Sequence, residues 1–138
     1  MKGLISAFCL TAMMALGSAP AMAQAETPVG TWQSESGDTR VRIAKCGQAM
    51  CGTVVSVRGE AKDVNNPDPN LRSRNLVGVQ MISNIQPSGQ GAWSGSLYNY
   101  RDGKTYTGKM RLNGSNALEL SGCVLGVFCR SQVWTRVQ

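Results

Sequence analysis

The sequence predicts an all-β fold, an eight-stranded antiparallel up-and-down barrel. Segments in which apolar and polar residues alternate recur at short intervals, with turn residues between them. The pairs Asp102-Gly103 and Asn113-Gly114 predict two-residue hairpin turns, because both positions tolerate positive φ. Sequential antiparallel strands must close into a barrel or leave two exposed edges, and closure removes the edges. A sandwich of two sheets is the alternative.

The expected strands follow one another without a convincing helix. The first is VGTWQS, and the hairpin of TRVRIAK and MCGTVVSV follows it. After a long polar loop come NLVGVQMISNI, GAWSGSLYNY, TYTGKMRL, ALELSG and SQVWTRV. A barrel of about eight strands can be filled by side chains or can hold one small ligand. Because aromatic residues are few and Gly and Ser are frequent, we expect a small cavity at most.

Residues 1–23 have the features of a cleaved signal peptide. Lys2 supplies the positive start, residues 4–16 are an apolar run, and Ala21-Met22-Ala23 is a small-x-small cleavage site. The run is shorter than the roughly 20 residues that span a bilayer, so no transmembrane anchor is expected. No cysteine follows the cleavage site to carry a lipid. We therefore expect a periplasmic protein in which residues 24–138 form a single domain.

Four cysteines follow the signal peptide, and an even number in an exported domain predicts disulfides. Three pairings are open, but the spacing favours two local bridges. GQAM lies as a hairpin loop between Cys46 and Cys51, and VLGVF lies between Cys123 and Cys129. A zinc site would need two close pairs brought together, and a thioredoxin-like centre has two intervening residues and a helix start. We expect neither of these, and no metal or cofactor.

The charge composition favours anionic partners weakly. The chain has 14 Lys and Arg against 8 Asp and Glu, and loss of Lys2 lowers the formal net charge from +6 to +5. The basic residues are scattered singly among strands and loops. No nucleic-acid partner is therefore expected.

Residue types that carry catalysis are scarce. The sequence contains no histidine, which removes the commonest general base, and bridged cysteines supply no thiolate nucleophile. The pairs Glu35 with Asp38 and Glu60 with Asp63 lie in polar turns, whereas a hydrolase needs two acids in one sheltered cleft. We expect that the protein is not an enzyme and has no catalytic residues.

The segment GEAKDVNNPDPNLRSR, residues 59–74, is longer than a hairpin requires, and loops of this length often bind or cover ligands. Pro67 breaks the calcium-loop spacing, which also lacks its Gly and its final Glu. The alternative is a proline-stiffened loop held by side-chain turns. Oxygens that could reach calcium belong to Asp63, Asn65, Asp68 and Asn70.

Two arginines at the end of this loop have two explanations. Arg72 and Arg74 could form an anion clamp beside a barrel mouth, or they could pair with Asp63 and Asp68 and fasten the loop. The pairing is the favoured explanation. Tyr98 and Tyr100 share one face of their strand, opposite Trp93 and Leu97, so with these two in the core the tyrosines are a binding patch or ordinary strand residues on the outside. The candidate ligand or partner contacts are Arg72, Arg74, Asp63, Asp68, Tyr98 and Tyr100.

The two ends of the domain carry a possible closing contact. Gly30-Thr31-Trp32 begins the first strand, and Arg136 lies in the last. A G-x-W entry with an arginine near the chain end resembles the lipocalin and fatty-acid-binding barrels. Because the first and last strands of a closed barrel are neighbours, Arg136 is expected over the ring of Trp32. Two unrelated core tryptophans are the alternative.

The chain also resembles one bacterial family as a whole, the exported proteins called domain of unknown function 2147. The matching motifs are GTW at 30–32, CGQAMCG at 46–52, DVNNPDPNLRSRNLVG at 63–78, WSGSLYNYRDGKTYTGKMRL at 93–112 and GCVLGVFCRSQVWTRV at 122–137. The resemblance implies a lipocalin-like eight-stranded barrel in the periplasm, without established catalytic residues.

These observations lead to two functional hypotheses. The first is a periplasmic binding protein that takes a small apolar or amphipathic molecule at one mouth of the barrel, with Arg72, Arg74 and the long loop orienting it. The second is a protein-binding module on a solid barrel, such as an inhibitor or an envelope assembly factor whose partner is an envelope protein. An interior with space would favour the first, and a filled interior the second.

Overall fold

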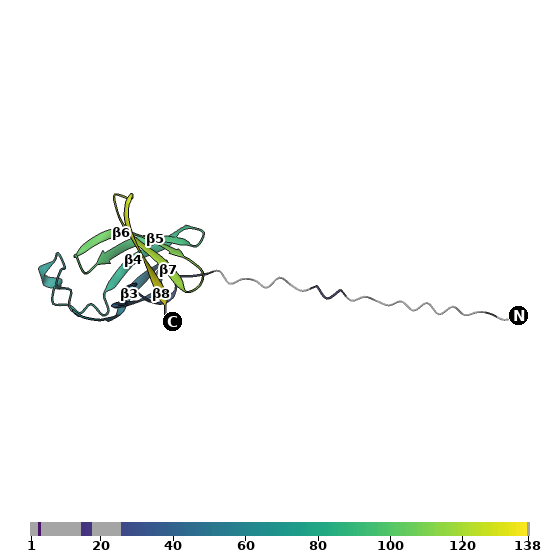
Figure 1. Ribbon diagram of the computed structural model, residues 1–138, viewed down its shortest axis with the longest axis horizontal. Helices are drawn as coiled ribbons and strands as arrows, with labels where there is room; N and C mark the ends of the chain where they lie inside the picture. Colours follow the sequence, from purple (N-terminus) through teal and green to yellow (C-terminus); the bar gives the residue numbers. More distant parts are fainter. Residues whose placement is uncertain (1–2, 4–14, 18–25, 138) are drawn as a thin grey trace.

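Eight β-strands form a closed barrel in which each strand pairs antiparallel with its neighbours in sequence (Figure 1). In this computed structural model residues 3, 15–17 and 26–137 are described, so most of the predicted signal peptide, with its cleavage site, lies outside the described residues. The barrel closes where β8 pairs with β1, through Trp32 with Arg136 and Gln33 with Thr135. The predicted fold class is confirmed, and closure excludes the sandwich.

Short loops connect consecutive strands, except for a long connection between the third and fourth strands. The strands are β1 (Gly30–Gln33), β2 (Thr39–Cys46), β3 (Ala49–Val57), β4 (Gln80–Gly89), β5 (Ala92–Asn99), β6 (Lys104–Leu112), β7 (Ala117–Val124) and β8 (Phe128–Arg136). The β3–β4 connection, residues 58–79, holds the 3-10 helix η1 (Pro69–Leu71) and extends from one side of the barrel (Figure 1). Within the described residues, no helix is long and apolar enough to cross a membrane.

The alternation in the sequence determines which side chains enter the barrel. In β2 the side chains of Thr39, Val41 and Ile43 are buried, while Arg40 and Arg42 between them are exposed. Successive side chains of a strand point to opposite faces, so a period of two gives one dry and one wet face. The same pattern continues through β6, as its sequence predicted.

The core is formed by side chains that point into the barrel. Its largest fully buried side chains are Trp32 and Trp134, and aliphatic side chains from the other strands surround them. Burial of a large apolar side chain stabilises a fold by about 1.5–3 kcal/mol. The same cluster contains Val41, Ile43, Val54, Ile82, Ile85, Trp93, Leu97, Met110, Leu112, Leu118 and Leu120.

Four hairpin loops differ in length from the sequence prediction. The predicted two-residue turns at Asp102-Gly103 and Asn113-Gly114 are wrong, because the loops span residues 100–103 and 113–116. A type I′ turn needs positive φ at both central residues, and here only Gly103 and Gly114 of these pairs have it. Conversely, the loop expected at GQAM is only residues 47–48, and the loop expected at VLGVF is residues 125–127.

Candidate functional site

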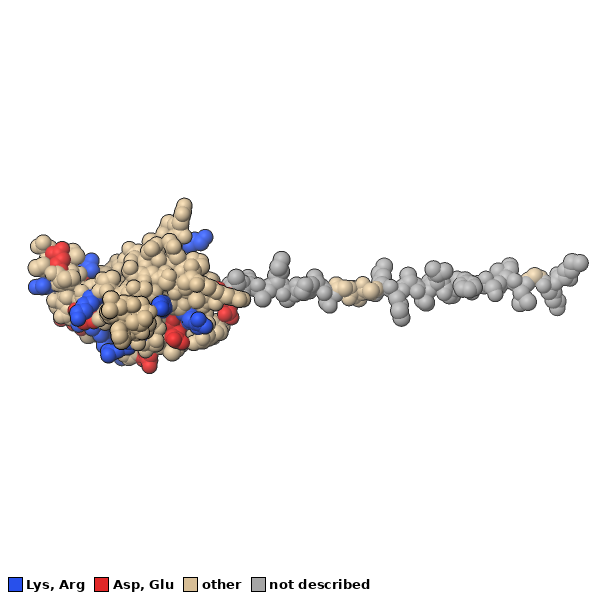
Figure 2. All heavy atoms as spheres, turned by 90° about the horizontal axis from the view of Figure 1, so that it is seen from above, with Lys and Arg blue, Asp and Glu red and all other residues tan. Residues whose placement is uncertain are grey.

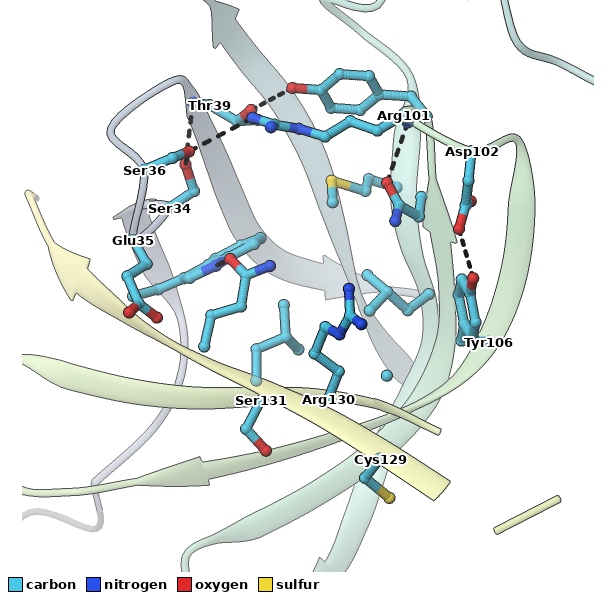
Figure 3. Close-up of a pocket in the computed structure, with 18 of the residues that line it drawn as sticks. Ser34, Glu35, Ser36, Thr39, Arg101, Asp102, Tyr106, Cys129, Arg130 and Ser131 are labelled. Carbon is cyan, nitrogen blue, oxygen red and sulfur yellow. Dashed lines mark hydrogen bonds between the residues drawn. The ribbon is translucent and has the colours of Figure 1, made fainter. Parts of the chain in front are cut away.

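The barrel is open at the end where the β1–β2, β5–β6 and β7–β8 connections lie, and a pocket of about 1020 Å³ opens there (Figure 3). Its lower wall is apolar and includes Met81, Leu97, Leu120 and Trp134. The expectation of a small cavity at most is therefore wrong. The pocket is larger because the β7–β8 hairpin extends its wall beyond the core.

A glycine on β7 widens the pocket. Gly122 lines it from β7, and a Cβ built at this position would meet Leu97 Cδ2 and the Tyr106 Cβ at 3.5 Å. That separation is an ordinary van der Waals contact, so a methyl group fits here but a longer side chain would project into the cavity. The missing side chain thus leaves space that a ligand can occupy.

One cation extends into this pocket from β8. Arg130 is paired in register with Gly122 of β7, so no neighbouring side chain on that strand covers it. Figure 3 shows its side chain pointing into the pocket, whereas Cys129 and Ser131 on either side point away. Among the described residues, no carboxylate forms an ion pair with Arg130. The pocket therefore combines an apolar wall with a guanidinium group that has no ion-pair partner among the described residues.

Polar side chains at the rim are bound to one another. The hydroxyl of Tyr106 donates a hydrogen bond to Asp102, which raises the pKa of Tyr106. Arg101 donates to Asp38 over 2.9 Å, and this contact raises the pKa of the guanidinium further. Tyr100 and Thr39 share a hydrogen bond between their hydroxyl groups. The contacts of Arg101 with Asp38 and of Tyr100 with Thr39 join the β5–β6 loop to the β1–β2 hairpin at the mouth (Figure 3).

A second polar cluster, the long-loop clasp, consists of Asp63, Asn66, Arg74 and Tyr98. Asp63 is fully buried and accepts from the Tyr98 hydroxyl at 2.6 Å, the Asn66 amide at 2.8 Å and the Arg74 guanidinium at 2.9 Å. Burial by itself would raise the pKa of Asp63, but the hydrogen bonds and the Arg74 charge together lower it below its ordinary value. The clasp thus fastens the β3–β4 connection to the outside of β5.

The remaining long-loop residues are also engaged within the loop. Arg72 donates from Nε to the Asn66 carbonyl over 2.8 Å, and Asp68 caps η1 by accepting from the Asn70 amide. The Asn65 amide donates to the carbonyls of Tyr100 and Arg101. Within the described part of the chain, no group of three or more His, Cys, Asp or Glu is placed to hold a metal.

The β3–β4 connection packs against the β5–β6 hairpin at Gly103. The φ of Gly103 is +72°, and a Cβ at this position would overlap the Asn65 carbonyl oxygen. Close backbone approach therefore requires glycine here.

The structure separates the predicted contacts into two places. Arg74 pairs with Asp63, as the favoured explanation had it, while Asp68 and Arg72 serve the loop itself. Tyr98 belongs to the clasp, and of the six candidate contacts only Tyr100 lines the pocket. Arg130, Tyr106 and Phe128 were not among the residues predicted from the sequence. Alternation through FCRSQVW places Phe128, Arg130 and Gln132 on the face of Trp134 and could have identified Phe128 and Arg130.

Both local disulfides are present. Cys46–Cys51 spans the β2–β3 hairpin, and Cys123–Cys129 joins residues that are paired across β7 and β8. The bridges lie at opposite ends of the barrel, so the four sulfur atoms form no common site.

At the far end of the barrel, Arg136 lies over Trp32. Its guanidinium carbon is 4.3 Å from the ring centroid, and its nitrogens donate to the carbonyls of Thr27, Val29 and Ser115. These bonds tie the segment before β1 and the β6–β7 loop to the last strand, so this end is covered while the other is open.

Tyr98 makes the clasp sensitive to alkaline pH. Burial and the bond to Asp63 raise the pKa of Tyr98 from 10.0 to about 12. Its contribution to stability is therefore complete below pH 10 and is lost as the pH rises to 12. We expect Tyr98→Phe to remove this component. Thermal melts of both proteins across this interval measure it, and parallel pH profiles would contradict the assignment.

An up-and-down barrel with one covered end, and with a pocket at the other, is a lipocalin-like fold. The fold is similar to the solved structure titled "Protein HP1028 from the human pathogen Helicobacter pylori belongs to the lipocalin family". The two share 24% sequence identity with a TM-score of 0.73, over 82% of this chain and 84% of that one. No curated protein matches the chain.

Residues 30–136 match the family described as an uncharacterized protein conserved in bacteria (DUF2147). The chain belongs to this family. The resemblance noted in its motifs is therefore confirmed over almost the whole barrel.

Proposed function

We propose that the protein is an exported, non-catalytic binding protein that holds a small amphipathic anion at the open mouth of its barrel. The observation that carries this proposal is Arg130, a guanidinium directed into an apolar-walled pocket without an acidic partner among the described residues. A carboxylate or phosphate group would pair with it, because guanidinium donates two parallel hydrogen bonds to such groups.

The apolar part of the ligand would lie against Leu97, Leu120 and Trp134 below Arg130. Each methylene group removed from water contributes about 0.8 kcal/mol, so a short alkyl chain in this pocket is enough for measurable affinity. The volume is of the size that proteins use for small molecules.

Several features support binding without chemistry. The sequence has no histidine, and all four cysteines after residue 23 are bridged. The acids at the mouth are already engaged, Asp38 by Arg101, Asp102 by Tyr106 and Glu35 by the Val133 amide. None of these groups is arranged as a nucleophile with its base.

The proposed location is the periplasm. Two disulfides are typical of an oxidising compartment outside the cytoplasm. The charged, apolar and small-residue segments of residues 1–23 support export by a cleaved signal peptide.

Native mass spectrometry after gentle purification tests this function. We expect a bound anion with an apolar chain, or uptake of one from a panel of fatty acids and lysophospholipids. A protein that is purified empty and takes up no member of the panel would contradict the proposal.

Gly122→Leu gives a matched test of the pocket itself. The leucine side chain would occupy the cavity beside Leu97 and Tyr106, whereas Gly122→Ala adds only a methyl group at an ordinary contact distance. We expect the leucine variant to lose uptake and the alanine variant to keep it, with circular dichroism spectra like that of the parent. Equal uptake by both variants would place the ligand elsewhere.

A further inference from the structure

The tip of the β7–β8 hairpin exposes an unusual number of apolar side chains. Val124 is 48% exposed, Leu125 85%, Val127 74% and Phe128 71%. We call these four residues the apolar tip. In Figure 1 the hairpin projects beyond the barrel. Single exposed apolar residues are common on soluble proteins, but four at one projecting point mark a contact surface.

The shape of this tip is fixed by the chain. The Cys123–Cys129 bridge closes its base, and Leu125 and Gly126 turn the chain with φ of 55° and 70°. The Val127 amide donates to the Val124 carbonyl within the turn. A free loop could fold its side chains back onto the barrel, whereas this hairpin holds Leu125 outward.

Basic side chains surround the tip. The Lys109 ammonium donates to the Gly126 carbonyl at 3.5 Å, and Lys104 lines a shallow hollow together with Val124 and Leu125. Arg130 follows the tip on β8. The segment 123–131 contains no acidic residue. Figure 2 views the molecule from the side toward which the hairpin projects, and both Lys and Arg (blue) and Asp and Glu (red) lie around uncharged surface (tan) on this face.

Two acids near the mouth, Glu35 and Asp102, keep their negative charge, because their hydrogen-bond donors are neutral groups. Glu35 accepts from the Val133 amide at 2.9 Å, and Asp102 accepts from the Tyr106 hydroxyl and the Lys104 amide. Asp38 is paired with Arg101. In the described residues, no acid forms an ion pair with Lys104, Lys109 or Arg130, so these three side chains can contact anionic groups beside the tip.

We propose that the apolar tip docks the protein on an anionic lipid surface. The four side chains would enter the boundary between head groups and acyl chains, while Lys104 and Lys109 contact the anionic head groups. A protein partner fits less well, because stable protein interfaces cover roughly 800 Å² on each side and this tip is small and convex. The pocket mouth, which Val127 and Phe128 border, would then face the membrane.

Flotation with vesicles tests the docking without any pocket ligand. The mature protein is mixed with vesicles of phosphatidylcholine alone or with added phosphatidylglycerol. We expect binding only to the anionic vesicles, weakened by salt. Leu125→Asn with Phe128→Ser is expected to lower the partition coefficient about tenfold, since asparagine tolerates the positive φ of Leu125 while the apolar area is lost. Lys104→Gln with Lys109→Gln is expected to lower it about tenfold as well.

Two control substitutions separate docking from general surface effects. Val55→Ser removes an exposed apolar side chain on the outer face of β3, and Lys45→Gln removes a cation from the end of the barrel opposite the mouth. Both should bind vesicles like the parent. Failure of the parent to float with anionic vesicles, or equal flotation of the tip variants, would overturn the proposal. A photo-crosslinker at Leu125 that captures only protein would also overturn it, in favour of a protein contact.

Discussion

Replacing Asp63 by alanine is expected to lower the free energy of unfolding by about 3 kcal/mol and the melting temperature by about 10–20 °C. Asp63 is fully buried and accepts hydrogen bonds from Tyr98, Asn66 and Arg74. Without it, a hydroxyl, an amide and a guanidinium group lose their acceptor at once. This loss of unfolding free energy lies at the lower end of the range for removing one partner of a buried ion pair, because the Arg74 side chain is 35% exposed and water can solvate it.

Asp68→Ala is the matched control in the same loop. Asp68 is exposed and caps only one turn of η1, so its loss is expected to cost about 1 kcal/mol or less. Urea unfolding of the two variants measures the difference. Equal midpoints for Asp63→Ala and the parent would show that the clasp does not contribute to the stability of the barrel.

Asp63 also makes the stability of the clasp sensitive to acid. Because the pKa of Asp63 is lowered on folding, its stabilisation is present at pH values above the ordinary carboxyl value and is lost as the pH falls through the lowered pKa. Asp63→Ala should therefore lose less stability than the parent between neutral and strongly acidic pH. With Tyr98 limiting the alkaline side, the clasp is complete only between these two titrations.

Most strands were predictable because apolar and polar residues alternate along them, as in β2 and β6. The alternation of Val41 and Ile43 with Arg40 and Arg42 determines which side chains of β2 point into the barrel. The pairing of β1 with β8 follows because a closed barrel makes its first and last strands neighbours. The clasp was predictable in part, since Arg74 had few acids within reach other than those of its own loop.

The pocket was not predictable, because a glycine that faces the barrel interior can either allow close packing or leave space, and the sequence does not distinguish the two. Gly108 packs closely, since a Cβ there would lie 3.3 Å from the Leu97 Cβ and 3.4 Å from the Gly95 carbonyl oxygen. Gly122 instead lines the pocket, where a Cβ would meet Leu97 and Tyr106 only at an ordinary contact distance of 3.5 Å. Hairpin length had the same ambiguity, because Asp102 and Asn113 accept either sign of φ and tertiary contacts decide between them.

Replacing Arg130 by methionine is expected to weaken the binding of a single-chain carboxylate about thirtyfold, which corresponds to about 2 kcal/mol for a hydrogen bond to a charged group. Methionine keeps the unbranched apolar stem, so the pocket wall is preserved while the charge is lost. The measurement is a titration of each protein with a fatty acid and with the fatty alcohol of equal chain length. The alcohol should bind parent and variant alike, because it uses only the wall of Leu97, Leu120 and Trp134.

Arg111→Met provides the comparison for total charge. Arg111 is exposed on the outer face of β6, where its loss removes the same charge without touching the pocket. If it weakens acid binding as much as Arg130→Met, the general field of a basic protein attracts the ligand and no directed contact is involved. If the acid and the alcohol are weakened equally in Arg130→Met, the arginine acts as part of the wall and the head group lies elsewhere. Only selective loss of acid binding in Arg130→Met assigns recognition of the anion to the guanidinium.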